Sequence, residues 1–314
     1  AANILATIEG VTVSAAEVAV RADSVVDLLS ITVGGAGAAG LSIGGSASIN
    51  FVDQNIQARV GSDTLTTTVN TTAEAGLSVV ANFTPKLFNL AFGGAASTGG
   101  AAGGLAVAIN DVANTVRAVV QGDNTAIHLG AAGALTVSAN TLEAALDDSA
   151  RFDTRGDDDN GIDLDAQVWS FSIGLGGGSG TGFAGSINLN WMRNTTQALV
   201  DGATVRGAAG SGRAGDVTVE AYNRASLSAF AGGASGGGSA AATVAVSLNF
   251  LGGTPDDDGV GNTAGTDRNL VEAAVVDADL TVDSLTVRTA SDGTINSFAA
   301  AISGAGTFAG NGSV

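Results

Sequence analysis

Residues Ser226–Val246 read SLSAFAGGASGGGSAAATVAV, a strand-like run of alternating small and apolar residues followed by a Gly-rich bend and a second strand-like run. Related segments recur along the whole chain. They are Ser30–Asn50, Leu90–Asn110, Ser170–Asn190 and a shortened copy at Ser297–Val314. Small residues at alternate positions leave one face of a strand almost without side chains, so another sheet or backbone can approach it closely. The pattern predicts thin, close-packed sheets that repeat along the chain.

Two other strand-like pieces recur around this motif in a fixed order. One carries the alternation of Thr with Val or Leu that half-buried strands prefer, and is found at Val11–Ala15, Leu65–Val69, Leu135–Ala139, Val217–Ala221 and Leu285–Thr289. The other runs from Asn or Gln to an acidic or Gly turn, and is found at Asn3–Gly10, Gln54–Ser62, Asn114–Gly122, Asn194–Gly202 and Asn269–Asp277. Helical periodicity is nearly absent and Gly interrupts most of the chain. We expect an all-β protein.

The spacing of the asparagines that end the Gly-rich motif gives the length of the repeat. Asn50, Asn110, Asn190 and Asn249 are separated by 60, 80 and 59 residues. The core repeat is therefore close to 60 residues, and residues 1–314 read as one continuous repeat array. Two insertions lengthen it, at 147–167 and 252–268. Each falls between predicted strands, where an added loop costs little closure entropy.

Two architectures fit a repeat of this kind. In a β-solenoid, each repeat would wind two rungs of about 30 residues, and rungs stacked at about 4.8 Å would span on the order of 50 Å. In that case the repeated asparagines would lie two rungs apart, too far to form a ladder directly. The alternative is a string of small β-sandwiches, one per repeat. Each sandwich would need a core of large side chains, and aromatic residues make up only 4% of the chain. The solenoid is the better prediction.

Composition excludes several classes of function. The net charge is −18, with 12 Lys and Arg residues, so we expect no nucleic-acid partner. The chain has no Cys and one His, His128, which excludes thiolate metal sites and most imidazole chemistry. No apolar run is long enough to predict a transmembrane segment. Runs such as Gly174–Gly182 are followed by neither a helix nor Lys-Ser/Thr, so they are turns rather than phosphate loops.

The strongest candidate for binding chemistry is DDDNGIDLD, residues Asp157–Asp165, which places five acidic residues in nine positions. Carboxylates closely spaced around a Gly turn can bind Ca²⁺ through oxygen ligands. We predict Asp157, Asp159, Asp163 and Asp165 as the ligands, although the spacing does not match an EF-hand. The alternative is a solvated acidic loop. A second acidic turn, Asp256–Gly259, is a weaker candidate.

The order of the pieces, the GGASGGG-type turns and the segment NTTQALVDGATV (Asn194–Val205) resemble repeats of large bacterial filamentous surface adhesins, of the filamentous-haemagglutinin-like or leukotoxin type. The resemblance covers nearly the whole chain, and the acidic insertions are not part of it. It implies secretion, a β-helical rod, an extracellular or cell-surface location and a role in attachment or matrix building. It carries no catalytic residues.

Together these observations predict a non-enzymatic extracellular structural protein, a rod or self-assembling fibre segment of an adhesin or surface filament. The chain opens with the Asn/Gln piece and stops inside the Gly-rich motif. We therefore expect it to join head to tail with another copy or with flanking repeats of a longer parent chain. The alternative is a calcium-dependent module that binds surface glycans or another surface. A polysaccharide-cleaving enzyme is disfavoured by the single lysine, Lys86, and the scattered arginines.

Overall fold

The computed structural model describes residues 2–74, 76–130, 132–142, 166–208, 212–252 and 269–314. The described residues form β-strands joined by turns and contain no α-helix. The strands pair in parallel in three sheets. The prediction of an all-β chain is confirmed.

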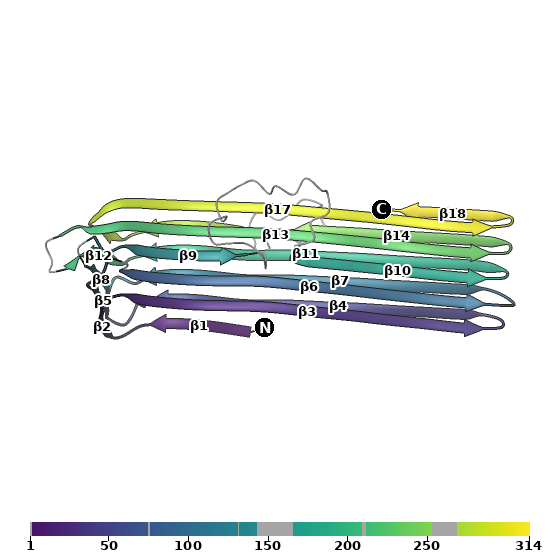
Figure 1. The fold of residues 1–314 in the computed structure, drawn as a ribbon, viewed down its shortest axis with the longest axis horizontal. Coiled ribbons are helices and arrows are strands. Elements are labelled where there is room, and N and C mark those ends of the chain that lie inside the picture. The colour runs from purple at the N-terminus through teal and green to yellow at the C-terminus, as the bar shows by residue number, and fades with distance from the viewer. Residues whose placement is uncertain (1, 75, 131, 143–165, 209–211, 253–268) are drawn as a thin grey trace.

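Each repeat contributes to the three sheets in the same order. Sheet A contains β1 (Ala2–Ile8), β4 (Ser42–Val60), β7 (Ala102–Gln121), β11 (Thr181–Asp201), β14 (Ala240–Leu251), β15 (Leu270–Val276) and β18 (Phe308–Ser313). Sheet B contains β2 (Thr12–Ala15), β5 (Thr67–Thr71), β8 (Thr125–Leu129), β12 (Thr204–Gly207) and β16 (Asp279–Leu280). Sheet C contains β3 (Val18–Ala38), β6 (Leu77–Ser97), β9 (Leu135–Thr141), β10 (Val168–Gly178), β13 (Ala214–Gly237) and β17 (Val282–Ala305). Long strands of sheets A and C run side by side in opposite directions, with sheet B at one end and tight turns at the other (Figure 1).

The register shows that one repeat makes one layer. Asn50 of β4 pairs with Asn110 of β7, which pairs with Asn190 of β11, which pairs with Asn249 of β14. The expectation of two rungs per repeat is wrong, because equivalent residues of successive repeats are direct neighbours. Five layers at about 4.8 Å span about 24 Å, roughly half the expected length. The repeats share continuous sheets, which is not the arrangement of separate sandwiches.

The first insertion interrupts a layer of sheet C. Both β9 and β10 pair with β6, but neither pairs with Pro85. Phe83 accepts a hydrogen bond from the N–H of Leu142, and the N–H of Leu87 donates to Gln167, so both backbones face this layer. Pro85 lies between them with the same orientation. Proline has no N–H to donate, and no described residue of β9 or β10 requires one from it.

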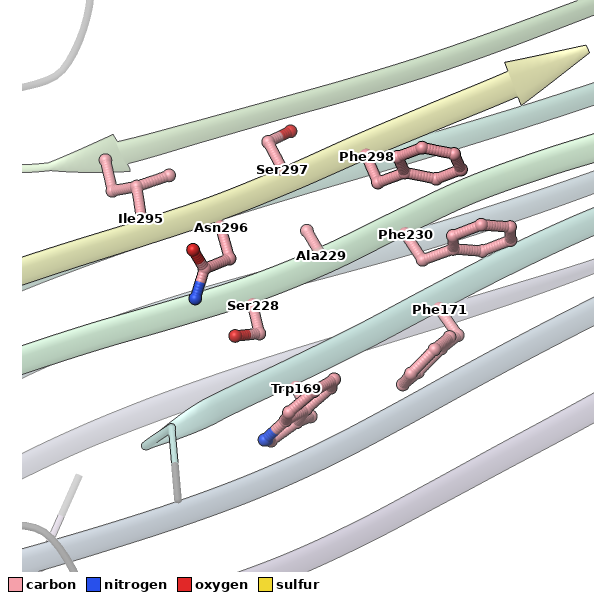
Figure 2. Close-up of a pocket in the computed structure, with 9 residues that line it drawn as sticks. All are labelled: Trp169, Phe171, Ser228, Ala229, Phe230, Ile295, Asn296, Ser297 and Phe298. Atoms are coloured by element: carbon pink, nitrogen blue, oxygen red, sulfur yellow. The ribbon is translucent and has the colours of Figure 1, made fainter. Parts of the chain in front are cut away.

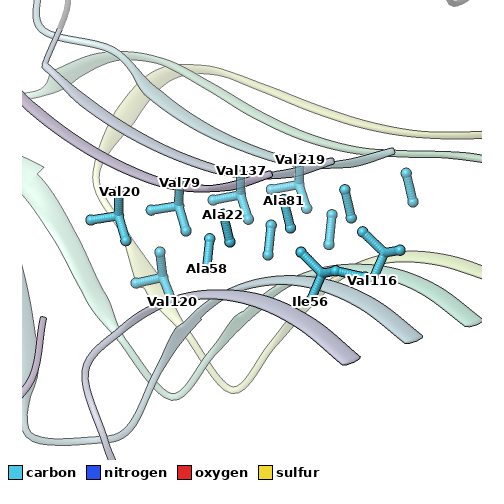
Figure 3. Packing of buried hydrophobic residues seen from close by; sticks show 14 of the residues in the cluster. Val20, Ala22, Ile56, Ala58, Val79, Ala81, Val116, Val120, Val137 and Val219 are labelled. Carbon is cyan, nitrogen blue, oxygen red and sulfur yellow. The ribbon is translucent and has the colours of Figure 1, made fainter. Parts of the chain in front are cut away.

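The space between sheets A and C has two different parts. Near sheet B it is filled by Val, Ile, Leu and Ala, with Val79, Val120 and Ile56 fully buried (Figure 3). In the other half the inward positions are Gly, Ala and Ser. A Cβ added to Gly93 would lie 1.8 Å from the carbonyl oxygen of Leu105, and one added to Gly176 would lie 1.8 Å from that of Phe183. At these glycines the two backbones approach so closely that no side chain fits between them.

Two adjacent glycines of β10 test this close approach. Gly176→Ala should lower the free energy of unfolding by about 3 kcal/mol, because its Cβ would overlap the backbone of Phe183 and the sheets must separate. Gly177→Ala is the matched control: nothing lies within 4 Å of its added Cβ, so the change should be neutral or stabilising by up to about 1 kcal/mol. Chemical denaturation measures both. Equal effects would contradict the close approach.

Candidate functional site

The predicted calcium ligands Asp157, Asp159, Asp163 and Asp165 lie outside the residues that the structure describes. Calcium binding at this loop therefore stays a prediction. Among the described residues, no group of three or more His, Asp or Glu side chains could hold a metal ion. Within that same part of the chain, no helix is long and apolar enough to cross a membrane.

A network of asparagines crosses the boundary between the two halves of the interior. The fully buried Asn110 lies at its centre. Its Nδ2 donates to Ser170 Oγ at 3.0 Å and to Asn190 Oδ1 at 2.7 Å. Its Oδ1 accepts from Nδ2 of Asn50 and Nδ2 of Asn89, both at 2.9 Å. Two donors and two acceptors complete the hydrogen-bonding capacity of this amide, so it has a structural role.

The asparagines of successive layers therefore contact one another directly. The ladder continues from Asn190 to Asn249 at 2.6 Å, and a second ladder joins Asn114 to Asn194 at 3.1 Å. The separation expected from two rungs per repeat does not exist. The ladder follows from the one-layer register, since stacked identical amides can donate to and accept from one another.

His128 has a similar structural setting on sheet B. The residue is half-buried, and its Nδ1 lies 3.0 Å from Asn70 Oδ1 in the neighbouring layer. Asn70 in turn donates to Ser14 Oγ at 3.2 Å. His128 thus belongs to a polar column on the outer face of sheet B, where Asn70 is its hydrogen-bond partner. This setting is not the one typical of a catalytic base.

The most distinctive surface feature is a column of aromatic residues on the outer face of sheet C, which we call the aromatic ladder (Figure 2). It consists of Phe88, Trp169, Phe171, Phe230 and Phe298. Trp169 stacks on Phe171 with ring centroids 5.6 Å apart, and Phe230 stacks on Phe298 at 5.4 Å. The register produces the ladder because Phe171, Phe230 and Phe298 occupy one position in successive layers.

A hollow of about 610 Å³ lies beside the ladder, where smaller residues follow Trp169 in the next layers. Ser228 pairs with Trp169, and Asn296 pairs with Ser228. The hollow is lined by these residues and by the rings of Phe171, Phe230 and Phe298 (Figure 2). Because the rings stack on one another, the ladder presents an apolar ridge rather than a row of separate ring faces on which sugars would stack.

The ladder belongs to a larger uncharged region, which we call the neutral half. It comprises residues 28–52, 87–110, 168–192, 225–251 and 294–314, which contain no Asp, Glu, Lys, Arg or His. These runs form the end of sheets A and C that lies away from sheet B (Figure 1). Sequence reasoning missed this region, although the uncharged runs can be read directly from the sequence.

Apolar side chains cover both outer faces of the neutral half. On sheet C, Ile31, Val33 and Ile302 are 56%, 71% and 68% exposed. On sheet A, Ile43 and Phe51 are exposed to a similar degree. Between the asparagine network and the tight turns the usual order is reversed, because small residues face inward and large apolar residues face outward.

Comparison of the chain with protein-family models, curated proteins and solved structures found no match.

The buried amide network generates a test of stability. Asn110→Leu should lower the free energy of unfolding by about 3 to 5 kcal/mol, because three buried partners and the half-buried Asn50 each lose a hydrogen bond. Asn55→Leu is the control, since Asn55 makes a single exposed bond to Asn3, and its effect should be below about 1 kcal/mol. Denaturant titration measures both. A small loss for Asn110→Leu would show that the network is dispensable.

Calcium binding has its own test. Millimolar Ca²⁺ should raise the melting temperature, because an ion that binds only the folded chain stabilises it by mass action. Asp159→Asn combined with Asp163→Asn should abolish the shift. The control is Asp256→Asn with Asp257→Asn in the second acidic turn, which removes the same charge and should keep the shift. Calorimetry that gives equal shifts for all three proteins would indicate general screening of the net charge, not a site.

Proposed function

We propose that the chain is a β-solenoid rod segment that serves as the shaft of an extracellular adhesin or surface filament, and that its layers continue from one segment into the next. The observation that carries the proposal is the in-register parallel pairing of successive repeats, which a further layer can continue. β1 pairs only with Gln54–Val60 of β4, toward sheet B. β18 pairs only with Ala240–Ala245 of β14, toward the tight turns.

The two ends are complementary half-layers. In the common register of sheet A, β18 and β1 cover different parts of one layer with no overlap. When a second copy is stacked on β17, its β3 becomes the next strand of sheet C. Its β1 then lies beside β18 in one shared layer. This is the head-to-tail contact proposed for the chain, and a flanking repeat of a longer chain would make the same contact.

The last layer also exposes core residues that another layer would cover. Leu285 and Val287 are 47% and 43% exposed, whereas Val217 and Val219, their partners one layer below, are fully buried. The outer edge of β17 carries backbone N–H and C=O groups that can pair with a further strand. In a repeat array each layer contacts only its neighbours, so one more layer extends the same interactions.

The extracellular location and the role in attachment or matrix building rest on the resemblance to filamentous adhesins and on the acidic, Cys-free composition. The proposed role is mechanical, and the residues that carry it are those of the strand register rather than a catalytic group. A calcium-dependent carbohydrate-binding module is the alternative, and no described residue favours it.

Head-to-tail stacking predicts rods whose length increases with protein concentration, in steps of about 24 Å for five layers. Val287→Lys should keep the rods short, because stacking would bury an unpaired ammonium group against the next layer. Thr286→Lys, which adds the same charge on the outer face of the same strand, should leave rod length unchanged. Electron microscopy and sedimentation velocity measure the lengths. Particles of single-segment height at every concentration, or equal lengths for the two variants, would contradict stacking.

A further inference from the structure

The neutral half has a second surface whose properties differ from those of the open ends. The outer face of sheet C presents Leu29, Ile31 and Val33 on β3 and Phe298 and Ile302 on β17, all more than half exposed. Between these outer layers lie the half-buried rings of the aromatic ladder. The patch is largely apolar and contains no charged residue.

The size of the patch is that of a specific interface. Five layers at about 4.8 Å and ten residues at about 3.3 Å give an area of roughly 800 Å². Monomeric soluble proteins rarely expose an apolar patch of more than about 600 Å². A stable protein interface buries about 800 Å² on each partner. The face is therefore large enough to support association without any contribution from the chain ends.

The distribution of charge selects another copy of this chain as the partner. All charged side chains lie outside the neutral half. Within the part of the chain that the structure describes, two copies can therefore bring their neutral faces together with no charged side chain in the contact. Sheet faces of this kind pack about 10 Å apart through interdigitating side chains. The aromatic ladder forms a ridge on this face, and the hollow of about 610 Å³ lies beside it. The ridge of one copy can therefore pack into the hollow of the other.

Lipid is a less suitable partner. The first and last layers, β3 and β17, have edges whose backbone N–H and C=O groups run the length of the neutral half. In hydrocarbon each unpaired group would cost several kcal/mol. Packing of one sheet face on another leaves these edges in water or paired with the next segment. This difference favours protein over lipid on the patch.

We infer that the outer face of sheet C in the neutral half, from Leu29–Val33 to Phe298–Ile302, is a lateral docking surface on which a second copy of this chain packs through the same face. The contact is independent of head-to-tail stacking, because it uses side chains on a sheet face rather than strand edges. It joins rods side by side.

Two lysines on the face test the inference. Ile31→Lys with Phe298→Lys should weaken lateral association at least tenfold, because both ammonium groups would be buried in an apolar contact. Val25→Lys with Thr286→Lys is the matched control: it changes the same two strands, on the same outer face and by the same charge, but in the half near sheet B. The control should associate as the parent does. Ile31→Thr with Phe298→Thr removes the apolar groups without adding charge and should also weaken association.

Sedimentation equilibrium is performed on all variants in the Val287→Lys background, so that head-to-tail stacking does not contribute. Circular dichroism confirms that each variant is folded. Salt should strengthen lateral association, because it screens the repulsion between two chains of net charge −18 and favours apolar contact. In the parent background, electron microscopy separates the two proposals, since stacking changes rod length and lateral docking changes rod width.

Three outcomes would overturn the inference. One is a strictly monomeric Val287→Lys protein at high concentration. The second is equal weakening by the Ile31/Phe298 pair and the Val25/Thr286 pair. The third is a combination of two results: the protein floats with phosphatidylcholine vesicles, and the Ile31→Lys, Phe298→Lys variant no longer floats but still associates laterally. This combination would assign the face to lipid. A parent protein that forms no long rods but still associates laterally would contradict head-to-tail stacking and leave lateral docking in place.

Discussion

In-register parallel pairing between successive repeats is the constraint on which the rest of the structure depends. Because equivalent residues are direct neighbours, a residue that suits one layer is stacked on the corresponding residue of the next. Asparagine over asparagine gives a ladder of amides, and phenylalanine over phenylalanine gives a ladder of rings. Charged residues cannot be stacked on identical residues in this way, because like charges in successive layers would repel one another. Glu220 pairs in register with Arg288, and Arg224 pairs in register with Asp292. Arg193 pairs in register with Ala113 and reaches diagonally to Asp111, with 2.5 Å between Nη2 and Oδ1.

The close approach of sheets A and C in the neutral half follows from the same constraint. Glycine at one inward position would leave a cavity, but glycine in four successive layers, at Gly34, Gly93, Gly174 and Gly233, removes most of a column of side chains and lets the backbones meet. No volume is then left inside for large residues. The strands still carry Ile, Leu and Phe at the alternate positions, and these must face outward. The exposed apolar surface is thus a direct consequence of the thin interior.

Much of this architecture can be predicted from the sequence. The alternation of Thr with Val and of small with apolar residues predicts strands. The prediction that runs such as Gly174–Gly182 are turns is wrong for most of their residues, because Gly174–Gly178 belong to β10 and only residues 179–180 separate it from β11. The number of layers per repeat cannot be derived this way, because a strand of about ten residues and one of about twenty have the same alternation. β3 continues through Ser30 without a turn, where the sequence suggested a boundary between two pieces. That continuity makes one repeat a single layer.

The surface was harder to predict than the strands. An alternation of Ala or Gly with Ile or Phe does not reveal which set faces inward, since a shift of one residue exchanges the two faces. The usual assumption places Phe230 and Ile302 inside, whereas the close backbone contacts at Gly93 and Gly176 exclude large residues from the interior. Runs without charge are visible in the sequence, but only the register shows that five of them lie side by side.

The two proposed contacts differ in what makes them specific. Stacking along the rod joins strand edges, so its register is set by hydrogen bonds and by the complementary half-layers of β1 and β18. Lateral docking joins apolar faces, which tolerate small displacements and gain little from any one residue. Both contacts must overcome the repulsion between chains that each carry a net charge of −18. In the proposed filament, strand pairing therefore determines length, and packing of apolar side chains determines width.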